Sequence, residues 1–270
     1  MSTIVSKYFD IGYMESLAQG TSALHQRDAR ALVLTTFIFI VTVVSLDKYS
    51  VSALMPFFFY PMSLMVWGGL PVGYVLSKAA AVSVVALMVG IFNPLLDRQV
   101  FVWVGPLGIS GGWMSYISVL LRFLLTVTAV LSMVAIAGFA VFCQALRTLG
   151  VPKPFVVQLM FLYRYVFVLT EDALRIERAR KARSFQPGAM RYSTYIPLLG
   201  HLLLRTFDRA ERIYRAMRCR GFDGKFRRLQ RSRCTGADVL FVVGWAAFFL
   251  AARAYNIPAQ LGHLIMGTKG

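Results

Sequence analysis

The sequence predicts an all-α, polytopic membrane protein with about five transmembrane helices and long amphipathic helices on the cytoplasmic side. Hydrophobic residues make up 57% of the 270 positions and charged residues 15%, and the mean hydropathy is +0.62. Such a chain is more apolar than one soluble core can bury. Several uncharged runs approach the ~20 residues that cross a bilayer as a helix. The net charge of +17 is uneven, because residues 147–233 hold 20 Lys or Arg against 6 Asp or Glu.

The first 30 residues are expected to form a cytoplasmic lead-in rather than a cleaved signal. This stretch carries Asp10, Glu15 and Asp28 among polar residues. It lacks the apolar core that a signal peptide needs. Insertion into the membrane should therefore begin with the first spanning helix.

Residues 31–146 are expected to form the first four transmembrane helices. These lie near 31–46, 50–66, 73–93 and 115–146. The uncharged run at 49–77 is too long for one span, and its Pro and Gly residues predict a helix, a turn and the start of the next helix. A second Pro- and Gly-rich region, 93–112, is expected to be a long loop rather than another span.

Residues 147–233 form a basic domain, and residues 234–270 hold a last transmembrane helix near 237–253 with a short tail. Lys and Arg are enriched in cytoplasmic loops. The basic domain and the N-terminus are therefore expected on the cytoplasmic side of the membrane. The membrane itself is expected to be the cytoplasmic membrane of a bacterium. The last helix then carries the C-terminus out.

The basic domain shows the pattern of amphipathic helices. Apolar residues recur at steps of three and four, which predicts a face that is buried: Leu203, Phe207, Ala210, Tyr214 and Met217. Opposite charges stand at i,i+4, which supports a helix, in the pairs Glu171/Arg175, Glu177/Lys181, Asp208/Arg212 and Glu211/Arg215. Several arginines have no such local partner, namely Arg178, Arg180, Arg183, Arg218 and Arg220.

The unpaired arginines allow three interpretations. They could face anionic lipid headgroups, neutralise nucleic-acid phosphates or bind an acidic protein partner. The third is favoured because two helices end alike, in Ala182-Arg183-Ser184 and in Cys219-Arg220-Gly221, each followed by Phe. Each end offers an arginine beside a small residue. Nucleic acid is disfavoured because no recognition motif accompanies a membrane anchor.

Several chemistries find no support in the sequence. The only histidines are His25, His201 and His263, too far apart for a metal-ligand motif, and His201 is expected to be a packing residue. The three cysteines show no CxxC spacing, and no GxxxxGK[ST] loop is present to bind ATP. Between their ends, the predicted spans carry only two charged residues, Lys78 and Arg122, both near predicted boundaries. Transport by this chain alone, or intramembrane catalysis, would need ionisable groups near the midplane.

The two helix ends resemble the signatures of the T component of energy-coupling factor (ECF) transporters, and most of all its cobalt-type CbiQ family. The similarity extends over Phe161–Ser184 and Leu199–Gly224, and to FNPLLDR at 92–98. Asp28-Ala29-Arg30 resembles an early Asp-Pro-Arg element of the family but lacks its proline.

The resemblance implies a non-catalytic coupling subunit. Two ABC-type ATPase subunits (CbiO-like) would each receive one coupling-helix end, with Arg183 and Arg220 pairing with acidic residues and Ser184 and Gly221 allowing close contact. A substrate-binding membrane subunit (CbiM-like) and a small accessory subunit (CbiN-like) would complete the importer. ATP and metal would be bound by these partners, with no cofactor in this chain.

Two alternatives remain open at this stage. Nickel could replace cobalt as the transported metal. The chain could also be a membrane scaffold whose basic domain only anchors lipid or recruits an acidic partner. Copurification with an ABC-type ATPase would separate a coupling subunit from a scaffold.

Overall fold

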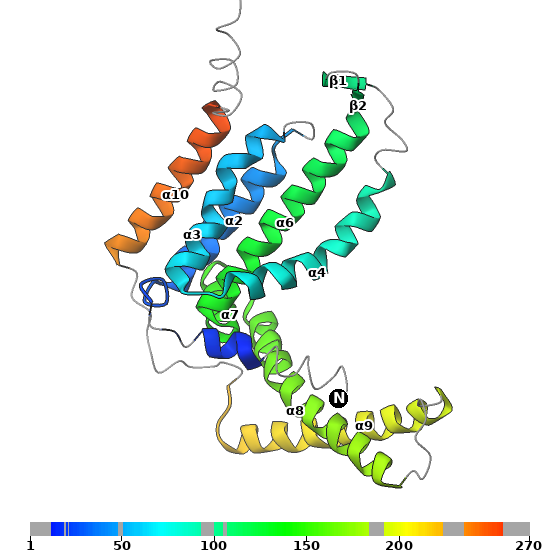
Figure 1. The fold of residues 1–270 in the computed structure, drawn as a ribbon. Helices are drawn as coiled ribbons and strands as arrows, with labels where there is room; N and C mark the ends of the chain where they lie inside the picture. The colour runs from blue at the N-terminus through cyan, green and yellow to red at the C-terminus, as the bar shows by residue number, and fades with distance from the viewer. Residues whose placement is uncertain are drawn as a thin grey trace, which may run out of the picture. The chain divides into compact units, whose positions relative to one another are not determined.

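The computed structural model describes residues 12–18, 20, 22–47, 51–92, 100–104, 107–183, 192–223 and 235–255. Its elements are almost all helices (Figure 1), as the sequence predicts. The chain divides into two compact units. One contains the two long helices of the basic region, α8 (Lys153–Arg183) and α9 (Tyr192–Cys219). The other contains the apolar helices and is described first.

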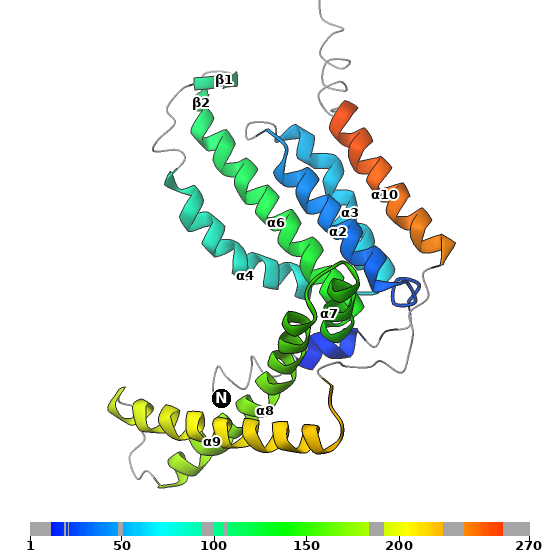
Figure 2. The same ribbon diagram turned by 180° about the vertical axis from the view of Figure 1, so that it is seen from behind.

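The apolar unit is a helical bundle built around its longest helix. Its helices are α2 (Ala29–Val44), η1 (Ser52–Phe58), α3 (Phe59–Gly68), α4 (Val72–Gly90), α6 (Gly111–Ala137) and α10 (Gly236–Tyr255). Helix α6 contacts α4 along one side and α2 and α3 along another, and α10 packs against α2 and η1 (Figures 1 and 2). The first and last helices of the unit are therefore neighbours.

A short hairpin precedes α6, where the sequence predicted only a long loop. Strands β1 (Val100–Val104) and β2 (Leu107–Ser110) are antiparallel, with Val104 opposite Leu107. All five residues of β1, Val-Phe-Val-Trp-Val, are β-branched or aromatic, and such residues favour strands. The Gly and Pro content hid this signal. Helix α6 begins at Gly111, directly after β2.

Glycines at positive φ set two of the helix boundaries. Gly69, at φ 63°, ends α3 and forms the predicted turn before α4. Gly138, at φ 75°, ends α6, and α7 (Phe139–Thr148) begins one residue later. A positive φ suits glycine and interrupts a right-handed helix. The prediction of one continuous helix over 115–146 is therefore wrong.

Four helices of the described chain are long and apolar enough to cross a membrane: α4, α6, α8 and α10. Helix α2 is apolar but shorter, with 16 residues. The span predicted at 50–66 is divided between η1 and α3, which places Pro56 in a 3-10 turn and Pro61 in the first turn of an α-helix. Helix α8 joins the group because its first half, up to Thr170, carries only Arg164 and Lys153 as charges.

Aromatic rings fill the space between α2, α3 and α10. Tyr60 is fully buried, and its ring lies 4.8 Å from that of Phe39, 4.9 Å from that of Trp245 and 5.3 Å from that of Phe249. Its hydroxyl forms a 2.8 Å hydrogen bond with the Thr36 hydroxyl of α2. A buried tyrosine needs such a partner. This cluster joins the first, third and last helices of the unit.

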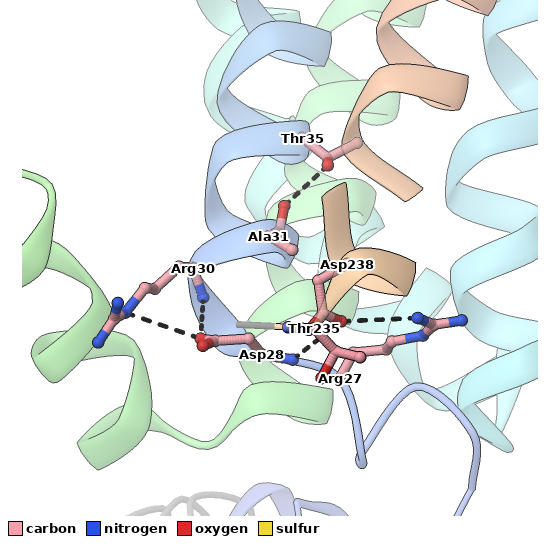
Figure 3. Close-up of polar contacts among 7 residues, drawn as sticks. All are labelled: Arg27, Asp28, Arg30, Ala31, Thr35, Thr235 and Asp238. Carbon is pink, nitrogen blue, oxygen red and sulfur yellow. Dashed lines mark hydrogen bonds and ion pairs between the residues drawn. The ribbon is translucent and has the colours of Figure 1, made fainter. Parts of the chain in front are cut away.

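The carboxylate of Asp238 ties the start of α10 to the start of α2 (Figure 3). Its Oδ2 accepts the Thr235 N–H at 2.9 Å, which caps α10. Its Oδ1 accepts the Asp28 N–H at 3.4 Å and lies 3.6 Å from the Arg27 guanidinium. Asp238 is 3% exposed. One buried carboxylate thus satisfies donors from two helix N-termini.

Asp28 is the N-cap of α2. Its Oδ1 accepts the Arg30 N–H at 3.0 Å, and the Arg30 guanidinium lies 3.9 Å away. Ala29 is the first residue of the helix, where the N–H has no partner within the helix and where proline is favoured. Alanine at this position, where the resembling element has proline, therefore costs no hydrogen bond. This explains how the Asp-Ala-Arg variant keeps the cap.

Two arginines bind the opposite end of α2. Arg122 of α6 donates to the Leu46 carbonyl at 2.8 Å and to the Asp47 carbonyl, and Arg253 of α10 donates to the Ser45 hydroxyl at 2.8 Å. Arg122 therefore does not mark the boundary of its own helix, as the sequence suggested. It lies well inside α6 and supplies donors to the C-terminal end of α2, where positive charge is favourable.

Small residues in the bundle serve internal packing. A Cβ added at Gly90 would lie 2.9 Å from the Tyr116 ring, and one at Gly68 would lie 2.9 Å from Ile136. Ala135 is also buried. For Gly90 and Ala135 the contacts are internal.

We expect Asp238→Ala to destabilise the bundle by about 3 kcal/mol, since it leaves Arg27 and two backbone N–H groups without their acceptor. The measurement is the midpoint of thermal unfolding of the full chain in detergent. Glu211→Ala is the matched control, because its carboxylate is 63% exposed, and it should change stability by less than ~0.5 kcal/mol. Equal midpoints for the two variants would show that the Asp238 contacts do not stabilise the bundle.

Candidate docking site

The second unit is a pair of crossed helices, α8 and α9 (Figures 1 and 2). Three of the predicted i,i+4 ion pairs form along them, at 2.6 Å between Glu171 and Arg175, 2.8 Å between Glu177 and Lys181, and 2.5 Å between Glu211 and Arg215. The predicted pair of Asp208 and Arg212 does not form. Because the three pairs are exposed, each adds only ~0.3–0.5 kcal/mol to its helix.

One ion pair links the two helices. The Asp172 carboxylate of α8 lies 2.7 Å from the Arg209 guanidinium of α9, and Asp172 is 7% exposed. A buried carboxylate needs a partner, and this arginine supplies one across the helices. Sequence spacing missed the pair, because its members are 37 positions apart and each has closer charges of the opposite sign along its own helix.

Arg183 and Arg220 are each separated by the same number of residues from the ion-pair member on their own helix. Arg183 follows Asp172 by 11 residues, and Arg220 follows Arg209 by 11 residues. Eleven residues are about three helical turns and ~16 Å of axis. Arg183 therefore lies on nearly the same side of α8 as Asp172, and Arg220 lies on nearly the same side of α9 as Arg209. The unit presents two arms of equal length that extend from one crossing.

Arg183 is the last residue of α8 and is exposed, as is Ala182 before it. It also lines a cleft between α8 and α9. Neither Arg183 nor Arg220 forms an ion pair with a described residue. Ser184, the third residue of the first signature, and the predicted helix stop at Pro187-Gly188 lie outside the described residues.

The second arm ends in a Schellman motif. Gly221 has φ 76°, the Phe222 N–H donates to the Met217 carbonyl at 3.0 Å, and the Gly221 N–H donates to the Arg218 carbonyl at 3.0 Å. This pattern satisfies the last carbonyls of a helix and requires a left-handed residue, usually glycine. It fixes the backbone that carries Arg220, which is exposed together with the free thiol of Cys219.

Gly221 therefore has a local role that differs from the one the sequence suggested. A Cβ at Gly221 would meet nothing within 4 Å in this chain. Its positive φ, rather than crowding inside the chain, is what selects glycine. Close approach by a partner at this position stays a prediction.

The apolar face of α9 is not buried in this chain. Phe207 is 66% exposed and Leu203 is 57% exposed. With three further residues of the same side they form a continuous surface, here termed the apolar stripe: Ile196, Leu199, Leu203, Phe207 and Tyr214. Helix α9 contacts α8 through another side, which includes Arg209. The predicted burial of this face does not occur within the chain itself.

Histidines and metal ligands add nothing to the site. Among the described residues, no group of three His, Cys, Asp or Glu is placed to hold a metal ion. The ring nitrogens of His25 contact the Ser22 hydroxyl at 2.7 Å and the Leu17 carbonyl at 2.9 Å. His201 is exposed, so its expected role as a packing residue is wrong.

Comparison with known proteins covers most of the chain. The model of the CbiQ family, described as cobalt transport protein, matches residues 20–231. Three similar proteins each bear the name energy-coupling factor transporter transmembrane protein EcfT. The protein of Ruminiclostridium cellulolyticum is 28% identical over 86% of this chain and 91% of its own length. That of Thermosediminibacter oceani is 26% identical over 82% and 88%, and that of Bacillus subtilis is 25% identical over 93% and 99%.

We expect Asp172→Asn to loosen the crossing of α8 and α9, because a charge-assisted contact of about 2 kcal/mol is lost. Spin labels at Cys219 and at Ala182→Cys, in a background with Cys143→Ala and Cys234→Ser, report the distance between the arms. The distance distribution should broaden in Asp172→Asn. It should narrow again in the exchanged pair Asp172→Arg, Arg209→Asp. An unchanged distribution in Asp172→Asn would assign the crossing to other contacts.

We expect Gly221→Ala to fray the last turn of α9, since alanine at positive φ costs about 1 kcal/mol. Hydrogen exchange of the amides from Met217 to Phe222 should become faster. Gly200→Ala is the matched control on the same helix, because its Cβ also meets nothing within 4 Å but its φ is helical. That change should slow exchange by removing a helical glycine. Slower exchange in both variants would exclude the conformational role of Gly221.

Proposed function

Because this chain belongs to the CbiQ family and is the transmembrane T component of an ECF transporter, we propose that it couples ATPase motion to the import of cobalt. The observation that carries this proposal is the pair of equal arms that extend from the Asp172–Arg209 crossing and end at Arg183 and Arg220. The chain is a non-catalytic, multi-pass membrane subunit. Its task is mechanical.

Each arm end binds one of two ABC-type ATPase subunits. Arg183 and Arg220 are exposed, and a guanidinium presents a planar fork of donors that suits a carboxylate. Gly221 supports this role by fixing the backbone of the second arm and leaving open space beside it. Ala182, Ser184 and Cys219 complete the two contact triplets.

The crossing converts movement of the ATPases into movement of the membrane subunits. When ATP binding and hydrolysis bring the ATPases together and apart, the arm ends move with them. Packed helices transmit such a displacement as rigid bodies. ATP is bound by the ATPases and the metal by the substrate-binding membrane subunit.

The apolar stripe of α9 binds the substrate-binding membrane subunit, alone or with a small accessory subunit. Five exposed apolar residues on one side of a helix form a surface that water solvates poorly. The side of α9 that carries Arg209 contacts α8, so the stripe stays available while the arms are crossed. Tilting of the arms would then tilt the subunit that rests on the stripe.

The N-terminus and the basic unit lie in the cytoplasm. The excess of arginine in α8 and α9 supports this orientation under the positive-inside rule. The ATPases reach the arms only on that side. A protease added outside intact cells should leave the loops of the basic unit uncut, and cleavage there would reverse the proposed topology.

Cobalt is the transported metal that the family description favours over nickel. Cells that express all importer subunits are compared with cells that lack only this chain. The loss of radioactive cobalt uptake in the second should far exceed the loss of nickel uptake. A larger loss of nickel uptake would assign nickel instead. Copurification of an ABC-type ATPase with the tagged chain tests the coupling role apart from the metal.

We expect Arg183→Glu with Arg220→Glu to abolish cobalt uptake and ATPase copurification, because two attractive contacts become repulsive. Loss should exceed about a hundredfold, since removal of one partner of a close charge pair costs ~2–5 kcal/mol. The membrane-inserted amount of the chain should not change. Arg178→Glu with Arg218→Glu is the matched control, with the same charge change on the other side of the same helix ends. Normal uptake by the first variant would exclude docking through these arginines.

A further inference from the structure

A cleft of about 610 Å³ lies between the last two turns of α8 and the first half of α9. Its polar wall consists of Arg180 and Arg183 from α8 and of His201, Arg205 and Asp208 from α9. Its apolar wall includes Ile176 and Leu204. The volume is in the range of small-molecule binding sites. Of these residues, only Arg183 has a place in the proposed coupling role of the arms.

The cleft carries an uncompensated positive charge. Three arginines line it against one carboxylate, that of Asp208. The ion pairs of the described helices use other arginines, Arg175, Arg209 and Arg215, and leave Arg180, Arg183 and Arg205 without a carboxylate. The Nε of Arg180 is buried and has no hydrogen-bond acceptor among the described residues. A buried donor in this position calls for an anionic acceptor from outside the chain.

The composition of the two walls identifies the class of ligand. Arginine forks match phosphate oxygens in a bidentate geometry. The apolar wall, by contrast, gives no advantage to a small anion or to an acidic peptide, which would leave Ile176 and Leu204 uncovered. A molecule with a phosphate at one end and hydrocarbon at the other would satisfy both walls. In a membrane protein, phospholipids of this kind are the surrounding solvent.

We propose that the cleft binds one anionic phospholipid of the membrane. Its phosphate lies between Arg180 and Arg205, and its glycerol and proximal acyl carbons cover Ile176 and Leu204. Arg183 lines the same cleft at the end of its arm. Occupancy of the cleft therefore places a lipid beside one of the two docking arginines. The binding itself does not depend on the proposed docking.

The test is native mass spectrometry of the purified full chain in detergent, titrated with phosphatidylglycerol or with phosphatidylcholine of the same acyl chains. The wild-type chain should bind one phosphatidylglycerol at concentrations where it binds no phosphatidylcholine. Arg180→Gln with Arg205→Gln should weaken this binding by roughly thirtyfold, since each basic residue near an anionic lipid contributes about fivefold. Millimolar inorganic phosphate should not displace the lipid, because phosphate does not cover the apolar wall.

Arg175→Gln with Arg215→Gln is the matched control. It removes the same charge from the same two helices, but at exposed ion pairs outside the cleft, and it should leave lipid binding unchanged. Leu204→Glu is a second test that keeps all arginines. Leu204 is 65% exposed, so the chain should fold, and the added carboxylate should repel the lipid.

Three results would overturn the proposal. Equal weakening of phosphatidylglycerol binding by Arg180→Gln with Arg205→Gln and by Arg175→Gln with Arg215→Gln would indicate diffuse attraction of the lipid to a basic surface. Displacement by inorganic phosphate would indicate a free-anion site. Unchanged lipid binding in Arg180→Gln with Arg205→Gln, combined with loss of ATPase copurification, would assign the cleft to an acidic segment of a protein partner. Failure of Arg183→Glu with Arg220→Glu to affect transport would leave the lipid site untouched, so the two proposals fail separately.

Discussion

The carboxylate of Asp238 joins the N-termini of two helices that are 210 residues apart in the chain. In an apolar environment the unpaired N–H and carbonyl groups of helix ends cannot rely on water. Several charged side chains of the bundle contact these ends. Carboxylates meet the N-termini of α2 and α10, and Arg122 meets the C-terminal carbonyls that follow α2. Each charge also has the sign that the helix dipole favours. The first and last helices are held together by this requirement as much as by their aromatic contacts.

In the basic unit, by contrast, a charged contact lies at the crossing of two helices rather than at their ends. Its two helices meet at Asp172 and Arg209 rather than along a shared apolar core, and the apolar stripe of α9 faces away from α8. Each arm continues for eleven residues from the ion pair to its arginine. Because the two helices share no apolar core, the space beside the crossing is not filled by their side chains. The open cleft at Arg180 is one consequence.

Local chemistry was predictable from the sequence, and long-range pairing was not. The arginine ends, three of the four i,i+4 pairs and the turn at Gly69 follow from residues within a few positions of each other. Asp172–Arg209 and Asp28–Asp238 could not be found by spacing, because tertiary packing chooses the partner. The break at Gly138 was missed because a glycine inside an apolar run is also compatible with a continuous helix. Gly221 was predicted to leave steric room for a partner, whereas its positive φ could not be predicted from the sequence alone.

The faces of α9 explain how one helix can serve several partners at once. Successive residues of a helix are rotated by about 100°, so Leu203 and Arg205, two positions apart, point to nearly opposite sides. A membrane subunit on the apolar stripe therefore leaves Arg205 and the cleft accessible. Arg220 lies beyond both, at the end of the helix. On α9, contacts on the stripe, in the cleft and at Arg220 would use different surfaces, whereas Arg183 of α8 belongs both to the cleft and to the end of its arm. When the arm moves, partners bound to these surfaces would move with it, because the surfaces belong to one rigid helix.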